Sequence, residues 1–520
     1  MEKTKVKKKS FVLRCLDGIE VVGNRLPPPM MIFIFLAAAI IVISGIGTAL
    51  GWSATGEVYN TKSMQIEETT INIVNLFSVS GLRYMLSNVI NNFMGYKSLG
   101  MMLTIMFGIG IAEYSGWLNG LIRKAVQITP YKLVTPMVVF IGAMSNLAEN
   151  AGYVLFVPLA AMIFKACKKH PLAGIAAGFA GVSGGFAANL MISSGDAVLS
   201  GFSDMAAKIM DPNYNVVASC NYFFMATSVF LIVIMGTFVT EKIIIPRLGE
   251  YKENGDGTLI EESAEMSAKD EKALKIANFV FLGIILFIAV SCIPQNSWLR
   301  NPETGSLIDG SLLLDAIVPL FTILFFVPGL VYGRISGKFK NSRDLFNGFS
   351  NSMRTLSGFI CVAFAASQFI NYFNYTNLGR ILSINGANVL QELNIGPIPL
   401  MLVFIVVSGF MNLFMTSASA KYAIFAPVFV PMFMTLGISP ELTQVAYRIG
   451  DSCTNIIAPV LSSLPIILQA MKRYDKDSGF GTLVSCMLPY TVVFMVSWSI
   501  MLVIWMLLKL PLGPGAYIYM

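Results

Sequence analysis

Long apolar segments separated by short polar ones run along most of the chain, a pattern that predicts a bundle of membrane-spanning helices. About 20 apolar residues suffice for a helix to cross the hydrocarbon core of a bilayer. The segments expected to cross are, in chain order, 30–49, 101–121, 171–193, 222–240, 276–293, 312–333, 346–372, 440–469 and 481–508. We therefore expect nine transmembrane helices.

Two other apolar regions are interrupted near their middle by polar residues, which predicts re-entrant hairpins. The first, 133–165, is interrupted at 145–150, and the second, 398–436, at 416–421. Each half is short for a complete crossing, and such a tip is tolerated in a membrane only where protein or water satisfies its polar groups. The expected fold class is an all-α polytopic membrane protein with about nine transmembrane helices and two re-entrant hairpins.

The two hairpins belong to an internal repeat. Residues 146–189 and 415–458 align without a gap at a constant shift, 422 − 153 = 269. The recurring pairs are Tyr153 and Tyr422, Pro158 and Pro427, Pro171 and Pro440, Gly181 and Gly450, and Ser183 and Ser452. Repeats that pair a hairpin with a Gly- or polar-interrupted helix are typical of secondary transporters, whose binding site lies where the repeats meet.

Charge sets the expected orientation. Hydrophobic residues make up 55% of the 520 positions and charged residues 12%, and the positive charges gather at the ends of apolar segments. Basic loops stay in the cytoplasm, which places the N-terminus, 1–29, and the loop 241–275 there and the C-terminus outside. The halves 30–240 and 276–520 then have hairpins of opposite orientation, giving inverted-topology repeats in a multi-pass inner-membrane protein.

The net charge of +7 does not indicate nucleic-acid binding, because no basic and aromatic platform accompanies it. The seven cysteines show no metal-binding spacing, and no cofactor is expected.

The candidate site residues lie at the repeats. Arg448, Asp451 and Asn455 form part of a polar run in segment 440–469 that lipid would not tolerate. A guanidinium suits a substrate carboxylate, and Asp451 suits a coupling cation. The alternative is a structural ion pair between Arg448 and Asp451, which are three residues apart on one helical face.

The other repeat and the second hairpin supply further candidates. Asn189 and Asp196 follow a glycine-rich stretch, although Asp196 could equally be a solvated loop residue. Asn412 and Ser419 lie at the hairpin tip, where hydroxyls and free amides can hold a carboxylate. Oxygen ligands near Asp451 and Asn189 suit Na⁺, and proton coupling remains equally open.

Three further charges lie in or near spans, and each could be a proton site or a structural partner: Glu113, Asp315 and Arg354. Lys421 either belongs to the second hairpin tip or extends its ammonium outward to water.

Two other function classes are disfavoured. GVSGG at 181–185 matches a serine-hydrolase motif, but the sole histidine, His170, is thirteen residues from Ser183, about 20 Å along a helix. An intramembrane serine protease, and an enzyme in general, is therefore not expected. A channel would share the polar spans, but paired hairpins of opposite entry favour a gated site.

Several strings closely resemble the p-aminobenzoyl-glutamate transporter (AbgT) family: HPLAGIAAGFAGVSGGFAANL, SASAKYAIFAPVFVPMFM, SPELTQVAYRIGDSCTNIIAP and the terminal LPLGPGA. The resemblance covers essentially the whole chain. It implies a homodimer and transport of p-aminobenzoyl-glutamate, a folate catabolite, while some members are described as exporters of sulfonamide-type antimetabolites. The family's site positions fall on Asp196, Asn412, Ser419, Tyr422, Pro440, Arg448, Asp451 and Pro459.

The chain departs from the family at two positions, with Tyr422 in place of Trp and Ala458 in place of Thr. A tyrosine can still stack on an aromatic ring.

Electrostatics then favour cation-coupled import by alternating access, since moving a dianion inward against an inside-negative potential costs about 4.6 kcal/mol per 100 mV, or about 2.3 per charge. The alternative is a proton-driven exporter of sulfonamide-type antimetabolites.

Overall fold

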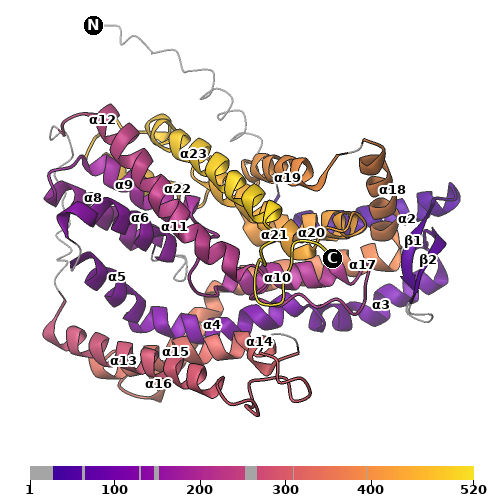
Figure 1. Ribbon diagram of the computed structural model, residues 1–520, viewed down its shortest axis with the longest axis horizontal. Coiled ribbons are helices and arrows are strands. Elements are labelled where there is room, and N and C mark those ends of the chain that lie inside the picture. The colour runs from indigo at the N-terminus through magenta and orange to yellow at the C-terminus, as the bar shows by residue number, and fades with distance from the viewer. Residues whose placement is uncertain are drawn as a thin grey trace, which may run out of the picture.

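The computed structural model describes residues 27–60, 65–127, 130–145, 152–251, 266–307, 310–393 and 395–520. Most of these residues are helical, and the helices form one long bundle (Figure 1). The predicted helical polytopic class is confirmed.

Six helical stretches in the described residues are long and apolar enough to cross a membrane, and a bent pair makes a seventh. They are α2 (Pro29–Ala49), α3 with α4 (Val79–Met94 and Lys97–Ser115), α11 (Tyr222–Val239), α13 (Ala268–Ser291), α15 (Ile317–Ser336), α23 (Phe480–Leu507) and the pair α16 and α17 (Ser342–Thr355 and Ser357–Tyr375). They overlap seven of the expected crossings, and the other two, 171–193 and 440–469, are the interrupted helices described below. The short elements are η1 (Tyr131–Leu133), η5 (Thr240–Ile244), α12 (Ile245–Leu248) and α14 (Leu312–Asp315).

One expected crossing, 101–121, ends earlier than its hydropathy indicates. Helix α4 stops at Ser115 because Gly116 adopts a left-handed conformation, φ 92°, which glycine reaches without a Cβ clash. The chain then turns into a separate helix, α5 (Trp117–Gln127).

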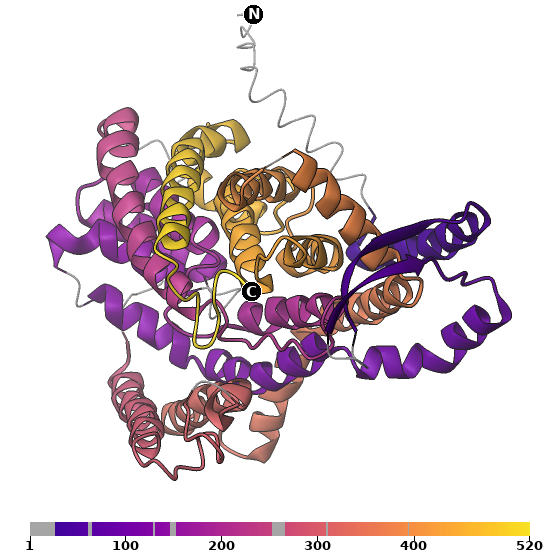
Figure 2. The same cartoon turned by 45° about the vertical axis from the view of Figure 1, so that its right-hand side comes forward.

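A β-hairpin lies between α2 and α3, in the polar segment between the first two expected crossings. Strands β1 (Ser53–Asn60) and β2 (Gln65–Asn72) pair antiparallel, and the segments contain the Val, Ile, Thr and Tyr residues that favour strands. Figure 2 shows this ribbon at one end of the molecule beside α2 and α3. Helix α18 (Leu378–Glu392) packs against it.

Both hairpin regions consist of two short helical arms. The first contains α6 (Val134–Met144), η3 (Gly152–Phe156) and α8 (Val157–Ala166), and its expected tip at 146–151 lies outside the described residues. The second contains α19 (Pro397–Asn412) and α20 (Ala418–Met434), joined by 413–417.

The interrupted helices follow the hairpins. In the first repeat, α9 (Pro171–Phe179) continues as η4 (Ala180–Gly184), breaks over 185–193 and resumes as α10 (Ser194–Ala207). In the second, α21 (Pro440–Asn455) breaks over 456–463 and resumes as α22 (Leu464–Lys472). The expected end at 193 therefore missed a second helical half, which a Ser193–Asp196 capping box starts.

The repeats interlock. Within each repeat the first hairpin arm packs on the interrupted helix, α6 on α9 and η4 and α19 on α21. Across the repeats, α10 packs on α20 and α22 packs on α8 and η3. Each interrupted helix consequently lies against an arm of the other repeat's hairpin.

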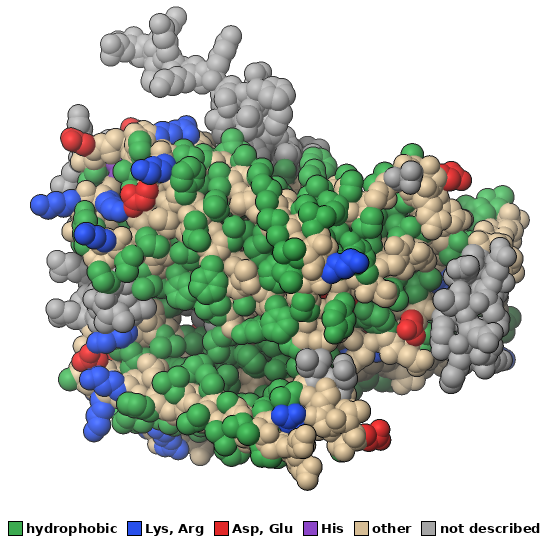
Figure 3. Space-filling view, viewed as in Figure 1, with side chains coloured by type: hydrophobic (Ala, Val, Ile, Leu, Met, Phe, Trp, Pro, Cys, Tyr) green, Lys and Arg blue, Asp and Glu red, His purple; other side chains and the backbone are tan. Residues whose placement is uncertain are grey.

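The surface is consistent with a lipid environment. Large apolar side chains are exposed along α13, including Phe279 (75%) and Leu286 (64%), and a soluble protein would rarely expose such a row. In Figure 3 hydrophobic side chains cover the middle of the visible face, while Lys and Arg gather at its left edge, over the region of α5, α8 and α12.

Gly450→Ala tests the close packing of α21 on α19. A Cβ at this position would lie 2.8 Å from the Gly409 nitrogen, so we expect the free energy of unfolding to fall by about 1–3 kcal/mol. Thermal unfolding of the detergent-solubilised protein measures it. The matched control is Gly283→Ala in α13, where a Cβ meets no atom within 4 Å. Equal unfolding temperatures for the two variants would contradict the packing.

Candidate functional site

A cavity of about 550 Å³ lies where the interrupted elements of both repeats meet. This volume is in the range of small-molecule sites. The lining comes from η3 (Tyr153, Val154), the first break and α10 (Phe186, Ala187, Asn189, Ser193, Ser194, Gly195, Val198, Leu199), the second hairpin (Thr416, Ser417, Ala418, Ser419), α21 (Arg448, Asp451, Asn455), the second break and α22 (Leu461, Ser462, Ser463, Ile466), and Met102 and Phe359.

Arg448 joins the repeats through a buried ion pair. Its Nη1 lies 2.6 Å from Asp196 Oδ1, and its Nη2 donates to the Ala187 carbonyl at 3.0 Å. Asp196 also accepts from the Ser193 backbone and hydroxyl, both at 2.7 Å. Asp196 is therefore not a solvated loop residue but the buried third residue of α10.

Asp451 pairs with a different partner from the one that its spacing suggests. Lys421 Nζ lies 2.7 Å from Asp451 Oδ1, and both side chains are almost fully buried. The expected alternative, an Arg448–Asp451 pair, is thus wrong, since each residue pairs with a partner from another helix. Lys421 is 1% exposed and does not extend outward to water.

Asn412 links the two arms of the second hairpin and helix α21 through hydrogen bonds. Its Oδ1 accepts from Lys421 Nζ at 2.6 Å, and its Nδ2 donates to the Asp451 carbonyl at 2.8 Å and Asn455 Oδ1 at 2.8 Å. It is fully buried behind the cavity wall, so it positions Asn455, which does line the cavity.

Two helices have their N-termini at the cavity. Helix α10 begins at the Ser193 cap, and α20 begins at the Ser417 cap, whose hydroxyl accepts from the Ala420 backbone. Ser419 lies in the first turn of α20 and lines the cavity. Free backbone amides and the helix dipole make both ends favourable for an anionic group.

Apart from Arg448 Nη1, whose contact is the ion pair with Asp196, three buried polar atoms on cavity-lining residues have no hydrogen-bond partner within the described parts of the chain: Arg448 Nε, Asn189 Oδ1 and Ser463 Oγ. An unpaired buried donor or acceptor costs about 1–3 kcal/mol. Donors and acceptors of this kind indicate a polar ligand in the cavity.

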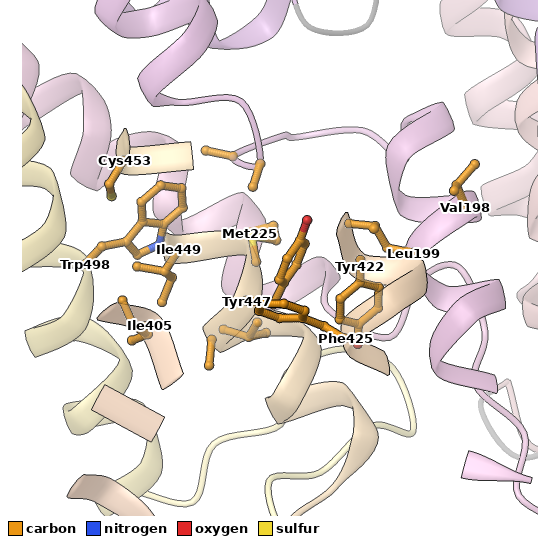
Figure 4. Close-up of a cluster of buried hydrophobic side chains, with 14 of the residues drawn as sticks. Val198, Leu199, Met225, Ile405, Tyr422, Phe425, Tyr447, Ile449, Cys453 and Trp498 are labelled. Atoms are coloured by element: carbon orange, nitrogen blue, oxygen red, sulfur yellow. The ribbon is translucent and has the colours of Figure 1, made fainter. Parts of the chain in front are cut away.

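Five sequence-derived residues do not line the cavity: Asp196 and Asn412, described above, and Tyr422, Pro440 and Pro459. Tyr422 is fully buried, its hydroxyl lies 2.7 Å from Ser203 Oγ, and its ring centroid is 4.5 Å from that of Tyr447 (Figure 4). Pro440 is the first residue of α21, and Pro459 lies in the second break. Tyr422 therefore packs behind the cavity lining, against Ser203 and Tyr447.

Sequence reasoning missed several lining residues. Ser193 starts α10 through an S-x-x-D capping box, which was a readable signal. Ser463 could have been found from the repeat, because 194 + 269 = 463 relates it to Ser194. Met102 and Phe359 come from α4 and α17, outside the repeats, and gave no local signal.

Comparisons with known proteins agree with this architecture. The model of the AbgT putative transporter family matches residues 14–520. The p-aminobenzoyl-glutamate transport protein of Escherichia coli (strain K12) is 37% identical over 499 residues, 96% of each chain.

Two solved structures are similar over nearly their whole length. One, the YdaH transporter of Alcanivorax borkumensis, has a TM-score of 0.87 and 36% identity over 94% of this chain and 100% of its own. The other, MtrF of Neisseria gonorrhoeae, described with a class of antimetabolite efflux pumps, has a TM-score of 0.91 and 41% identity over 97% of this chain and 100% of its own.

Tyr422→Phe tests the supporting role of this residue. Removing its hydroxyl from Ser203 should lower the free energy of unfolding by about 1 kcal/mol, and Ser203→Ala should do the same. The double variant should lose less than the sum of the single losses, as expected for residues in contact. Unfolding of the solubilised proteins measures this coupling, and strictly additive losses would show that the hydrogen bond does not form.

Proposed function

The chain belongs to the AbgT putative transporter family, and on this premise we propose that it is a secondary active transporter of p-aminobenzoyl-glutamate or a closely related aromatic carboxylate. It is a membrane transporter and not an enzyme. The one hydrolase-like motif has no base, because Ser183 is buried in η4 and His170 Nδ1 accepts a hydrogen bond from the Leu172 backbone at the start of α9.

Arg448 is the observation on which the proposal rests. Its guanidinium lies in the cavity wall, its Nε is without a partner among the described residues, and its ion pair with Asp196 keeps the planar group in place. A guanidinium binds a carboxylate through two parallel hydrogen bonds, and the N-termini of α10 and α20 add amide donors nearby. A substrate with carboxylates matches these donors.

The rest of the lining favours an aromatic group. Phe186, Val198, Leu199, Phe359 and Tyr153 contribute apolar and aromatic surface to the same cavity. A ligand with an aromatic ring at one end and carboxylates at the other would bury its ring here while its charges reach Arg448 and the helix ends. p-Aminobenzoyl-glutamate has this division.

Charge balance argues for coupling to cations. Among the residues that the structure describes at the site, Arg448 and Lys421 are positively charged and Asp196 and Asp451 are negatively charged. Their formal charges therefore cancel. A bound dianion would therefore leave two negative charges, and its inward movement would cost about 4.6 kcal/mol per 100 mV, or about 2.3 per charge. Two monovalent cations would make import electroneutral, and three would make it electrically favourable. Na⁺ near Asn189 and Asp451 or protons on the aspartates could supply them.

The interlocked repeats suit alternating access. The cavity wall is shared between the two hairpins and the two breaks, so movement of one repeat against the other would open it to one side at a time. We place the protein in the inner membrane as a homodimer, with its N-terminus in the cytoplasm and its C-terminus outside. Support for this orientation comes from the basic loops and the basic edge of the molecule.

Export of antimetabolites is the second candidate. The observation that favours it is the 41% identity to MtrF over 97% of this chain. Sulfonamide-type compounds also combine an aromatic ring with a polar group, so the same cavity would accept them, and a proton gradient would drive their release.

Uptake of labelled p-aminobenzoyl-glutamate into proteoliposomes separates these functions. Na⁺ and proton gradients are imposed separately and together on protein of known orientation. Saturable accumulation driven by one gradient supports a coupled importer and identifies its ion. Absence of accumulation under every gradient, together with proton-driven efflux of a sulfonamide from loaded vesicles, would support the exporter instead.

Arg448→Ala should abolish carboxylate recognition. Loss of one partner of a buried charge pair typically costs 2–5 kcal/mol of binding, so we expect transport to fall at least about 30-fold in a protein that still inserts and elutes as the wild type does. The matched control is Arg247→Ala, because Arg247 is a surface residue that hydrogen-bonds Ser485. Wild-type uptake by the Arg448→Ala protein would remove this residue from the site.

A further inference from the structure

The Lys421 ammonium lies where a bound cation would be expected. It contacts Asn412 Oδ1 at 2.6 Å and Asp451 Oδ1 at 2.7 Å, and it sits 5.4 Å from the centroid of the Tyr447 ring. Carboxylate and amide oxygens together with a π face form a complete environment for a positive charge. The position lies between the second hairpin and the interrupted helix α21, where transporters of inverted-repeat architecture hold their coupling ions.

The first repeat has none of these groups. By the shift of 269, Lys421 corresponds to Gly152, Asp451 to Val182 and Asn412 to Ala143. The first repeat nevertheless forms the same arrangement of arm and interrupted helix, with α6 packed on η4. Since a buried ion pair is costly to desolvate and apolar residues suffice at the equivalent positions, the fold alone does not explain the charges of the second repeat.

Asp451 is the residue of the pair that is accessible from the cavity. Both side chains are almost fully buried, but Asp451 lines the cavity whereas Lys421 does not. A proton needs only access to the carboxylate, but a metal cation would have to displace the ammonium from both oxygens.

Few other titratable groups face this pair. On α21 they are Tyr447, Arg448 and Cys453, on α20 Tyr422, and on α10 Asp196, which Arg448 holds. Helix α19 and η4 contain no titratable side chain, and on α23 the tyrosine, Tyr490, bonds Thr240 in η5 instead. Lys421 is therefore the cation that directly balances Asp451.

We propose that Lys421 is a tethered cation that fills the cation position of the second repeat and closes it to Na⁺. A cation from solution then enters this half as a proton that binds Asp451. The carboxylate becomes a neutral acid, the ammonium keeps its protons, and the pair changes from zero to one positive charge, as if a monovalent cation had bound. The coupling consequence rests on the proposed transport function, whereas the tethered-cation site does not.

Lys421→Ala tests the site without any substrate. The substitution removes propylammonium from the side chain and leaves the oxygens of Asn412 and Asp451. We expect the unfolding temperature to fall in N-methylglucamine chloride and to recover by several degrees in NaCl and in n-propylammonium chloride, because ligands that bind only the folded state stabilise it. The wild type should show no comparable gain from either salt.

Two controls define the result. Lys169→Ala removes a lysine that pairs with Glu241, a residue outside the cavity lining, and should gain no response to Na⁺. The double variant Lys421→Ala, Asp451→Asn leaves no unpaired charge and should also lose the Na⁺ response. If Lys421→Ala does not fold, Lys421→Gln, which keeps the packing, is measured in the same way.

A folded Lys421 variant whose unfolding temperature responds to Na⁺ and n-propylammonium no more than the wild type would overturn the proposal. Because the measurement uses no substrate, its outcome is independent of whether p-aminobenzoyl-glutamate is transported. A failure of uptake in proteoliposomes would reject the transport proposal and leave this site untouched.

Discussion

The structure depends on one constraint, that helix ends within a membrane must find their polar partners inside the protein. Lipid offers no hydrogen bonds, so each break in a helix costs free energy unless another part of the chain satisfies it. Here the repeats satisfy each other. The Ala187 amide at the first break donates to Ser452 Oγ of α21, and the Ala187 carbonyl accepts from Arg448. The hydrogen bonds that satisfy polar groups at the first break therefore also hold the two repeats together around one cavity.

The buried charges follow from this arrangement. Arg448 reaches from the second repeat to Asp196 at the start of α10, and Lys421 reaches from the second hairpin to Asp451. Neither pair joins residues of one helix, so each ion pair connects two elements whose separation would expose an uncompensated charge. Such pairs are costly to break, and a ligand or proton that changes their charge can therefore bias how the elements pack.

Much of this architecture could be predicted from the sequence, for reasons that are local. Hydropathy located the long apolar helices, although not α3 or α18, and the repeat identified both hairpins and the α21 polar run, because polar residues stand out in membrane-spanning segments. The prediction that was wrong concerned contacts between residues of different helices. Arg448 and Asp451 are three residues apart, which suggested that they pair with each other. Arg448 instead pairs with Asp196, 252 residues away, and Asp451 pairs with Lys421, 30 residues away.

The family resemblance suggested site residues, but it did not indicate which of them line the cavity. Tyr422 is close in sequence to the second hairpin tip, but its ring turns to Ser203 and Tyr447 rather than to the cavity. Helix α10 was missed because a hydropathy reading ended the crossing at 193, whereas the capping box starts a second helical half there. Helix α4 ends before Gly116 because this glycine adopts a positive φ, a backbone property that hydropathy does not indicate.

The most direct measurement is an experimental structure of the protein with p-aminobenzoyl-glutamate bound. We expect ligand density in the cavity between the two repeats, with a carboxylate beside Arg448 and the N-terminus of α10 or α20 and the ring against Val198, Leu199 and Phe359. Density only at a site that excludes Arg448 would show that the breaks of the two repeats do not form the substrate site.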